Sequence, residues 1–534
     1  NTWRLDDVDR GLLNGIMQFN SVETVAGGSG DDTFVFNFYG MYANPIVAGG
    51  ENDRDSVDVR ALGVRAYEIN DTSINGVLGI ERIIAASGST LTGASSGINQ
   101  WSITDSNEGI LSNGSSSMGF SGFSILQGSG AAEDQFIIAL GASFNGQLRG
   151  GADSNLQDNT FTNINAGNAW ELSAANNGTV GSTSFTNIGE LNGSGTDTLT
   201  AFAQANAWNL SAPTNGTINS SELAFTGMTN LNGGAGDDDF IFDFNGAYAG
   251  TIEAGGEADE DTLNIVIRGA TSQTLGQAIN GVMGVEYVTV ATGSTLNGIG
   301  GGTTNVWAIT GENAGRVTNG TERLGFAGFS ILAGTAASAD QFTIDDGVSF
   351  TGQLQGGVDS DLQQNTFTNN TEGNTWVLSA ANDGDVGLTS FTNIGVVNGS
   401  GTDTLEAFDQ SNDWMLNSTA GGTINVSELT FSGMQNIVGG SEDDRFVFDF
   451  VDVYTGMVDG GGEDAGDSVD VSSRGAILHT LGGATINGTS VQGIEELIAA
   501  EGSTLRGVSS GTNAWVIDAA NEGIGQCIRK SKCR

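Results

Sequence analysis

Hydrophobic and polar residues alternate in short runs along the chain. In Phe240–Phe244 and again in Phe446–Phe450, every second residue is a phenylalanine. A period of two places one set of side chains on one face of a β-strand. Glycine makes up 84 of the 534 residues, and a glycine in a helix interior costs about 1 kcal/mol relative to alanine. The pattern therefore predicts an all-β chain of short strands joined by glycine-rich turns.

A long repeat organises the sequence. All eight tryptophans occur in one motif, Asn-x-Trp, and the motif returns with a period of about 206 residues. The tryptophans are Trp3, Trp101, Trp170, Trp208, Trp307, Trp376, Trp414 and Trp515. This period predicts one repeat unit over residues 1–205, a second over 206–411, a partial third over 412–526, and a separate basic tail over 527–534.

A shorter rhythm runs inside each unit. The glycine pair at Gly27 and Gly28 returns 22 residues later at Gly49 and Gly50, and the other two units repeat this step. Such a step holds two or three short strands with their turns, which is one coil of a β-solenoid. We therefore expect a parallel β-solenoid (β-helix) built from coils of about twenty residues.

The tryptophans allow two interpretations. Exposed indoles stack on sugar rings and would form a glycan-binding surface. Alternatively, Trp170 lies two residues before Leu172 on one strand face, so both side chains point into the core. The second interpretation is favoured, and stacked asparagine amides would then explain the Asn that precedes each Trp by two places.

Charge limits the partners of the chain. Sixty-three Asp and Glu face 17 Lys and Arg, for a net charge of -46, which excludes nucleic acid and anionic membrane surfaces as partners held by phosphate neutralisation. Divalent cations and a saline exterior fit this surface. No apolar run reaches 18 residues, so membrane insertion is not expected.

Cysteine and histidine are scarce. Cys527 and Cys533 both lie in the tail, where they could close a small disulfide loop, and the thiol-free body is typical of exported surface proteins. The single histidine, His479, has no equivalent in the other repeats, so a histidine-based triad or zinc site cannot be assembled. Enzyme activity is therefore not expected.

Three glycine-rich stretches carry candidate metal ligands. They are residues 27–35, 233–241 and 439–447, and each places an Asp at its sixth position: Asp32, Asp238 and Asp444. The next coil offers a second Asp in each unit: Asp55, Asp261 and Asp467. Glycine lets a turn aim carbonyl oxygens inward, and carboxylate oxygens are ligands for Ca²⁺. The competing interpretation is that these Asp residues cap turns by accepting backbone N–H groups.

These stretches resemble the calcium-binding nonapeptide of the RTX (repeats-in-toxin) family. Their combination with Asn-x-Trp strands resembles the repeat regions of giant secreted bacterial exoproteins and adhesins of the filamentous-haemagglutinin type. The resemblance implies export, a β-solenoid rod, Ca²⁺ as a cofactor, and a role in adhesion, biofilm matrix or surface filaments. The chain departs from RTX repeats because the second Asp of each unit comes one place late and Glu442 replaces a glycine.

The sequence thus favours a secreted structural repeat protein that forms a rod or associates with copies of itself. A glycan-binding adhesin is the alternative, with cell-surface or matrix glycans as partners. A polysaccharide-cleaving β-helix enzyme would need arginines beside the paired carboxylates, and arginine is sparse here.

Overall fold

The structure is a computed structural model. It describes residues 1–50, 54–69, 73–114, 116–130, 132–152, 156–219, 222–256, 260–320, 322–358, 361–425, 428–462, 466–482, 484–507 and 526–527. Trp515 and Cys533 lie outside the described residues, and only the backbone of Cys527 is described. The predicted disulfide therefore stays a prediction.

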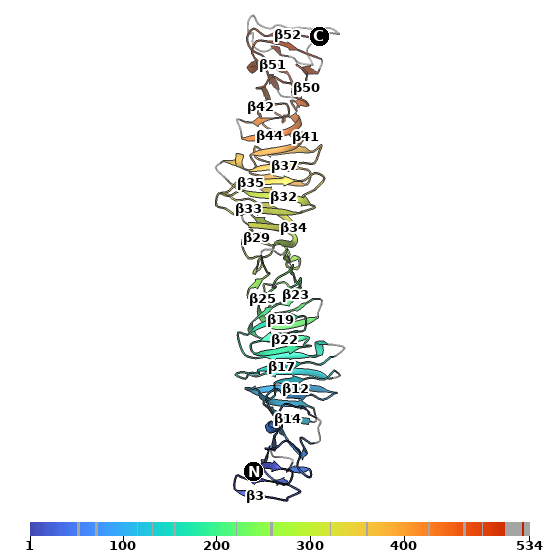
Figure 1. The fold of residues 1–534 in the computed structure, drawn as a ribbon. Coiled ribbons are helices and arrows are strands. Elements are labelled where there is room, and N and C mark those ends of the chain that lie inside the picture. Colours follow the sequence, from blue (N-terminus) through green and yellow to red (C-terminus); the bar gives the residue numbers. More distant parts are fainter. Residues whose placement is uncertain are drawn as a thin grey trace. The chain divides into compact units, whose positions relative to one another are not determined.

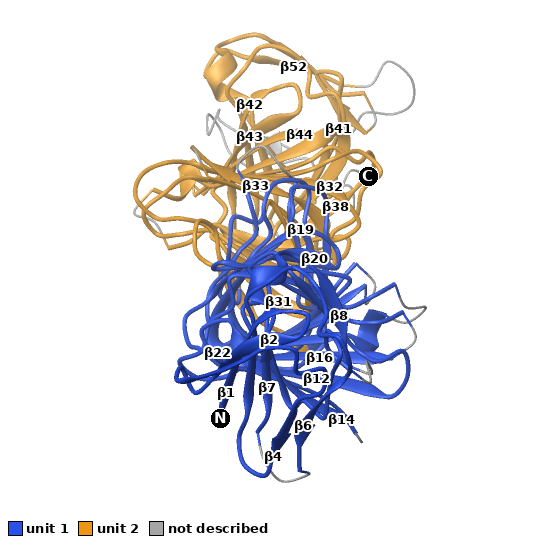
Figure 2. Ribbon diagram, turned by 60° about the horizontal axis from the view of Figure 1, so that its bottom comes forward, with its two compact units in different colours: residues 1–267, 280–285 blue, residues 268–279, 286–534 orange. Residues whose placement is uncertain are grey.

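The described chain is all-β, as the alternating pattern predicts, and it divides into two compact units. Unit 1 contains residues 1–267 and 280–285, and unit 2 contains residues 268–279 and 286–534 (Figure 2). The strands of each unit form a mostly parallel sheet. The helical elements among the described residues are short 3-10 turns, none long enough to cross a bilayer: η1 (Arg60–Leu62), η2 (Leu156–Asp158), η3 (Val266–Arg268), η4 (Leu362–Gln364) and η5 (Ser472–Arg474).

In unit 1 the strands follow one another in two hydrogen-bonded ladders. The first ladder runs in the order β1 (Thr2–Asp7), β5 (Thr33–Phe36), β7 (Ser56–Asp58), β10 (Arg82–Ile84), β14 (Ser116–Ser121), β13 (Glu108–Asn113), β12 (Ile98–Asp105), β16 (Glu133–Ile138), β18 (Thr160–Asn163), β22 (Glu190–Thr200), β25 (Leu223–Asn232), β24 (Asn215–Ile218), β23 (Ala207–Ala212), β26 (Asp239–Phe242) and β28 (Thr262–Asn264). The second runs in the order β8 (Ala66–Glu68), β11 (Thr90–Thr92), β15 (Ile125–Gln127), β17 (Gly146–Arg149), β21 (Thr183–Thr186), β20 (Asn177–Val180), β19 (Ala169–Ala174), β22, β25, β27 (Ile252–Glu253) and β30 (Val282–Met283). The remaining strands are β2 (Arg10–Leu13) and β3 (Met17–Phe19) beside β1, and the separate set β4 (Ala26–Gly28), β6 (Ile46–Gly49) and β9 (Val77–Leu78).

Unit 2 repeats this arrangement. Its first ladder contains β31 (Tyr287–Asn297), β34 (Glu322–Ala333), β33 (Ala314–Asn319), β32 (Asn305–Gly311), β35 (Asp340–Ile344), β37 (Thr366–Asn369), β41 (Val396–Glu406), β44 (Leu429–Val438), β43 (Gly421–Ile424), β42 (Asp413–Ser418), β45 (Arg445–Phe448), β47 (Ser468–Asp470), β51 (Glu496–Ile498) and β53 (Gln526–Cys527). Its second contains β29 (Ser272–Thr274), β31, β34, β36 (Gly352–Gln355), β40 (Thr389–Thr392), β39 (Asp383–Val386), β38 (Thr375–Ala380), β41, β44, β46 (Met457–Asp459), β50 (Thr489–Gln492) and β49 (Thr485–Ile486), while β48 (Leu478–Thr480) pairs with β52 (Thr504–Arg506).

Every described tryptophan strand opens a three-stranded antiparallel meander. In the meander β12–β13–β14, the last strand pairs in parallel with β10 and the first pairs in parallel with β16. The tight turn after β12 places Asn107 at φ 53°, and the repeat-related Asn313 lies at φ 48°. Asparagine tolerates this left-handed region better than most residues. The meander thus inserts one antiparallel strand, β13, between β14 and β12 of an otherwise parallel ladder. Figure 1 labels β12 and β14.

Aromatic side chains fill the interior beneath these strands. Six tryptophans have no exposed surface: Trp101, Trp170, Trp208, Trp307, Trp376 and Trp414. Trp101 stacks on Phe136 with ring centroids 5.5 Å apart, and Trp307 stacks on Phe342 at the same 5.5 Å. Parallel pairing brings Trp101 and Trp307 directly beside the Phe of the next strand, because the two side chains occupy the same register position. Trp170 and Trp376 instead meet a leucine at this position. Burial therefore removes these six indoles from any role as an exposed sugar platform, while Trp3 is half-buried.

We predict that Phe342→Ala lowers the free energy of unfolding by about 3–5 kcal/mol, because it opens a cavity beneath Trp307. Its outward-facing neighbour provides the control, and Thr343→Ala should change the free energy by no more than about 0.5 kcal/mol. Guanidinium unfolding followed by circular dichroism measures both. Equal effects of the two substitutions would contradict the inward direction of this strand face.

Candidate functional site: buried carboxylates and amides at the turns

The six candidate aspartates are buried and come together in the three expected pairs. Each has at most 1% of its surface exposed. In every pair the backbone N–H of the first Asp donates to Oδ1 of the second, at 2.8 Å for Asp32 and Asp55, 2.7 Å for Asp238 and Asp261, and 2.8 Å for Asp444 and Asp467. This is the geometry of side chains that cap backbone groups at turns, since a buried N–H needs an acceptor.

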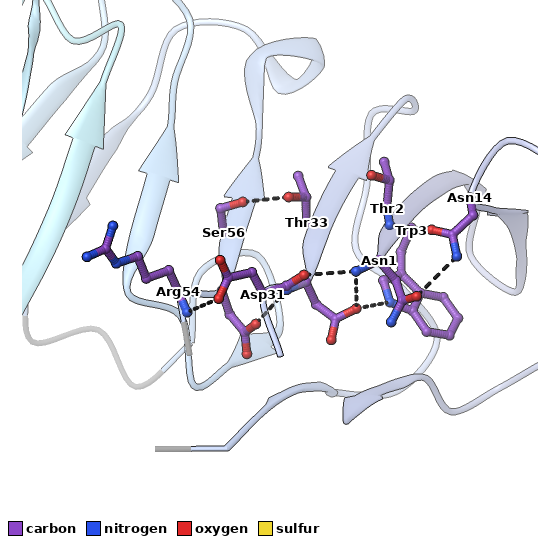
Figure 3. Close-up of polar contacts among 10 residues, drawn as sticks. Asn1, Thr2, Trp3, Asn14, Asp31, Thr33, Arg54 and Ser56 are labelled. Carbon is purple, nitrogen blue, oxygen red and sulfur yellow. Dashed lines mark hydrogen bonds and ion pairs between the residues drawn. The ribbon is translucent and has the colours of Figure 1, made fainter. Parts of the chain in front are cut away.

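Residues beside the first pair form further hydrogen bonds between the same two turns. Oδ1 of Asp31 accepts the backbone N–H of Arg54 at 3.0 Å, and the side chain of Ser56 donates to Thr33 at 3.0 Å (Figure 3). Asp237 occupies the same place in the second repeat, where it accepts the N–H of Glu260 at 3.0 Å. Asp31 thus accepts an N–H of the following turn, while Asp55 of that following turn accepts the N–H of Asp32, so the two turns cap one another.

The second oxygen of each buried carboxylate lies against a glycine of its own turn. A methyl group at Gly233 would lie 2.5 Å from Oδ2 of Asp238, and one at Gly334 would lie 2.1 Å from Oδ2 of Asp340. No heavy-atom side chain fits in that space, so the turn requires glycine. Oδ2 of Asp238 has no hydrogen-bond partner among the described residues.

We call this pairing of a turn glycine with the Asp or Asn that folds over its Cα the turn clasp. It recurs throughout the described chain, at Gly27/Asp32, Gly49/Asp55, Gly93/Asn99, Gly128/Asp134, Gly150/Asn159, Gly193/Asp197, Gly233/Asp238, Gly255/Asp261, Gly298/Asn305, Gly334/Asp340, Gly356/Asn365, Gly399/Asp403, Gly439/Asp444 and Gly460/Asp467. The nonapeptide pattern finds only three of these positions because the spacing from glycine to clasp residue varies. The shared signal is a glycine followed by Asp or Asn before the next apolar strand.

The clasp also explains the Asn-x-Trp motif. The backbone N–H of Asn206 donates to Oδ1 of Asp238 at 2.9 Å. In the meander that begins at Trp170, the indole N–H donates to Oδ2 of Asp197 at 2.9 Å, while the backbone N–H of Asn168 donates to Oδ1 of the same carboxylate at 3.0 Å. Asp197 thus receives both the Asn and the Trp of this motif, which is a different arrangement from a ladder of asparagine amides alone.

Burial shifts the acid-base equilibria of two pairs. Burial raises the pKa of Asp238 to about 7. Hydrogen bonds from Asn206 lower this pKa, and the nearby carboxylate of Asp261 raises it further. Burial likewise raises the pKa of Asp467 to about 7, and Asp444 contributes further repulsion. Two carboxylates buried side by side cannot both ionise without cost. The pairs therefore bind protons more readily than ordinary carboxyl groups do.

The side chains around these aspartates bear on the predicted metal site. The described residues contain no group of three or more His, Cys, Asp or Glu side chains placed to hold a metal ion, and an all-oxygen calcium site takes six to eight ligands. Oδ1 of the second Asp in each pair is already used by a backbone N–H. The described geometry fits turn capping better than an RTX-type site, and calcium binding stays a prediction.

His479 is also buried, with 1% of its surface exposed, and Nδ1 lies 3.0 Å from the amide of Asn487. Burial lowers the pKa of His479, so the ring is held neutral. Hollows lined by described residues near β9 and near β50 have volumes of about 220 and 90 Å³, below the range of about 300–1,000 Å³ typical of small-molecule sites.

Comparison with known proteins adds no assignment: neither the protein-family models nor the curated proteins give a match to this chain.

We predict that Gly334→Ala strongly destabilises unit 2, by more than about 2 kcal/mol, because the methyl group would displace the carboxylate of Asp340 from its hydrogen bonds. Gly300→Ala is the matched control. A methyl group there meets nothing closer than 3.6 Å, so thermal unfolding should be almost unchanged. A similar loss in both variants would show that the clasp is not the cause.

A second prediction concerns pH. The folded-state pKa of Asp238, about 7, lies above the unfolded value of about 3.9. The neutral carboxyl therefore stabilises the fold fully below the unfolded pKa, and this stability is lost as pH rises through about 7. Asp261→Asn should flatten the decline in melting temperature between about pH 5.5 and pH 8.5, since it removes the neighbouring charge. An asparagine can replace the acceptor, since Asn159 and Asn365 already accept the corresponding backbone N–H in other turns.

The measurement is the difference in melting temperature between the wild type and Asp261→Asn across this pH range. His479 is present in both the wild type and the variant. Its contribution to stability is lost as pH falls, and it cancels when the two melting temperatures are subtracted. Parallel pH profiles would refute the coupling between Asp238 and Asp261.

Proposed function

We propose that the chain is a secreted structural repeat protein, a parallel β-solenoid of about twenty-residue coils that forms a rod and associates with copies of itself at the cell surface or in a matrix. The observation that carries the proposal is the turn clasp, which recurs at fourteen turns of the described chain. In many of these pairs the buried polar group accepts a backbone N–H of a neighbouring turn, as Asp55, Asn159 and Asp197 do. Polar residues that an enzyme would use for chemistry are thus used here to join one turn to the next.

The packing of the strands supports the same proposal. Buried apolar side chains of the first ladder lie beside those of the next strand, as Trp208 does beside Phe240 at 5.5 Å and Phe240 does beside Leu263. In repeat architectures, such nearest-neighbour contacts provide most of the stability. A chain stabilised in this way can grow in length without needing a larger core.

The charge of the chain supports an exterior location and salt-dependent association. A net charge of -46 makes copies repel one another at low ionic strength, and screening at about 0.15 M salt shortens that repulsion to about 8 Å. Self-association should therefore require salt or divalent cations.

We expect electron microscopy and sedimentation velocity of the purified chain to show elongated particles of uniform width, with larger assemblies at about 0.5 M than at about 0.02 M NaCl. Globules joined by thin linkers would overturn the solenoid, and particles of one size at every salt concentration would overturn self-association.

Melting the chain in excess calcium and in excess chelator tests the predicted cofactor in the same preparations. Binding to the folded state alone raises the melting temperature. Equal melting temperatures would remove Ca²⁺ from the proposal and leave the scaffold role intact.

A further inference from the structure

The outer face of the first ladder in unit 2 is free of outward-pointing acidic side chains from β31 through β44. Its outward positions carry Thr, Ser, Gln, Asn, Val, Ala and Gly, together with Tyr287 and two arginines. Glu322, at the start of β34, lies instead beside Gly276 at the strand end. On a chain with 63 acidic residues, this face is open to an anionic partner that the rest of the surface would repel.

An aromatic platform lies on this face. Tyr287 of β31 pairs with Gly325 of β34, and a methyl group on Gly325 would lie 2.4 Å from Cδ2 of the Tyr287 ring. The ring therefore lies across the neighbouring strand, where Gly325 leaves room for it. Tyr287 keeps 36% of its surface exposed. An aromatic ring held flat against a sheet offers its outer side for stacking.

Two arginines flank the platform. Arg316 of β33 is opposite Gly325, and Arg323 of β34 is opposite Thr318 of β33. The two are diagonal neighbours, within reach of one another across an antiparallel pair. Both are exposed, and neither forms an ion pair with a described residue. Two like charges placed together repel unless an anion lies between them, so their placement favours an anionic ligand.

Unit 1 provides an internal comparison. At the repeat-related positions, Arg82 replaces the tyrosine and pairs with Glu108 at 2.7 Å, while Ile110 and Ser117 replace the two arginines. On the corresponding face of unit 1, the arginine is thus already paired with a carboxylate of the same sheet. The same strands fold with either set of residues, so Tyr287 and the arginines are not needed for the architecture.

We propose that Tyr287, Arg316 and Arg323 form a binding site for an anionic polysaccharide. A guanidinium binds a carboxylate or sulfate group through paired N–H donors, and the tyrosine ring packs against the apolar face of a sugar. Farther along the same face, the amide of Asn398 donates to Thr368 at 3.2 Å and accepts from Ser432 at 2.7 Å. This row of hydroxyl and amide groups extends the site for the following sugar units. The site does not depend on self-association.

The test is binding of the full chain to immobilised polygalacturonate and dextran sulfate, with uncharged dextran as the ligand control, at about 0.15 M NaCl. We expect binding to one or both anionic polymers and none to dextran. The double variant Arg316→Ile, Arg323→Ser, which introduces the residues of unit 1, should weaken binding about tenfold or more. Tyr287→Ala should weaken binding to the same polymer.

The control is the double variant Arg4→Ser, Arg10→Ser, which removes two positive charges that already pair with Asp6 and Asp7 and should leave affinity unchanged. Far-ultraviolet circular dichroism verifies that each variant is folded. The proposal is overturned if both double variants lose affinity equally, if neither does, or if dextran binds as well as the anionic polymers. Preference for one polymer identifies carboxylate or sulfate as the recognised group.

Discussion

The structure depends on buried side-chain acceptors that satisfy the backbone N–H groups of the turns. A stack of short parallel strands must turn twice or more per coil, and each turn leaves N–H groups without a strand partner. In this chain Asp or Asn supplies the acceptor from inside the turn, and a glycine makes room for it, as Gly334 does for Asp340. The indole N–H of the neighbouring tryptophan then joins several of these carboxylates to the aromatic core.

The clasp explains why so acidic a chain tolerates buried carboxylates. Where an amide occupies the position, as at Asn159, the turn has the same hydrogen bond without a charge. Where two aspartates meet, burial and mutual repulsion raise the pKa, as at Asp238 and Asp467. The turns thus share one type of hydrogen bond. Its acceptor is a neutral amide where the residue is Asn and a carboxyl group with a raised pKa at Asp238 and Asp467. At the first pair, hydrogen bonds from Trp3 and the N-terminal residue outweigh burial and hold the pKa of Asp32 below its ordinary value.

Acidic and basic side chains occupy different parts of the outer surface. Acidic side chains gather at the turns, exemplified by Asp31, Asp237 and Asp443, where they cap exposed N–H groups. The outward face of the first ladder in unit 2 is nearly neutral and carries Arg316 and Arg323. This division lets a strongly negative chain present a limited surface to an anionic partner, while the turns keep the remainder of the molecule soluble.

The sequence by itself determined the strands, the long repeat and the pairing of six aspartates, because alternation, glycine spacing and repeated motifs are local properties of the chain. It could not reveal that Asp134, Asp197, Asp340 and Asp403 serve the same purpose, since the number of residues between glycine and clasp residue changes from turn to turn. The antiparallel meanders and the meeting of Tyr287 with Arg316 and Arg323 were likewise decided only by tertiary structure. Strand register brings together residues that are distant in sequence, and register follows from which apolar faces cover one another.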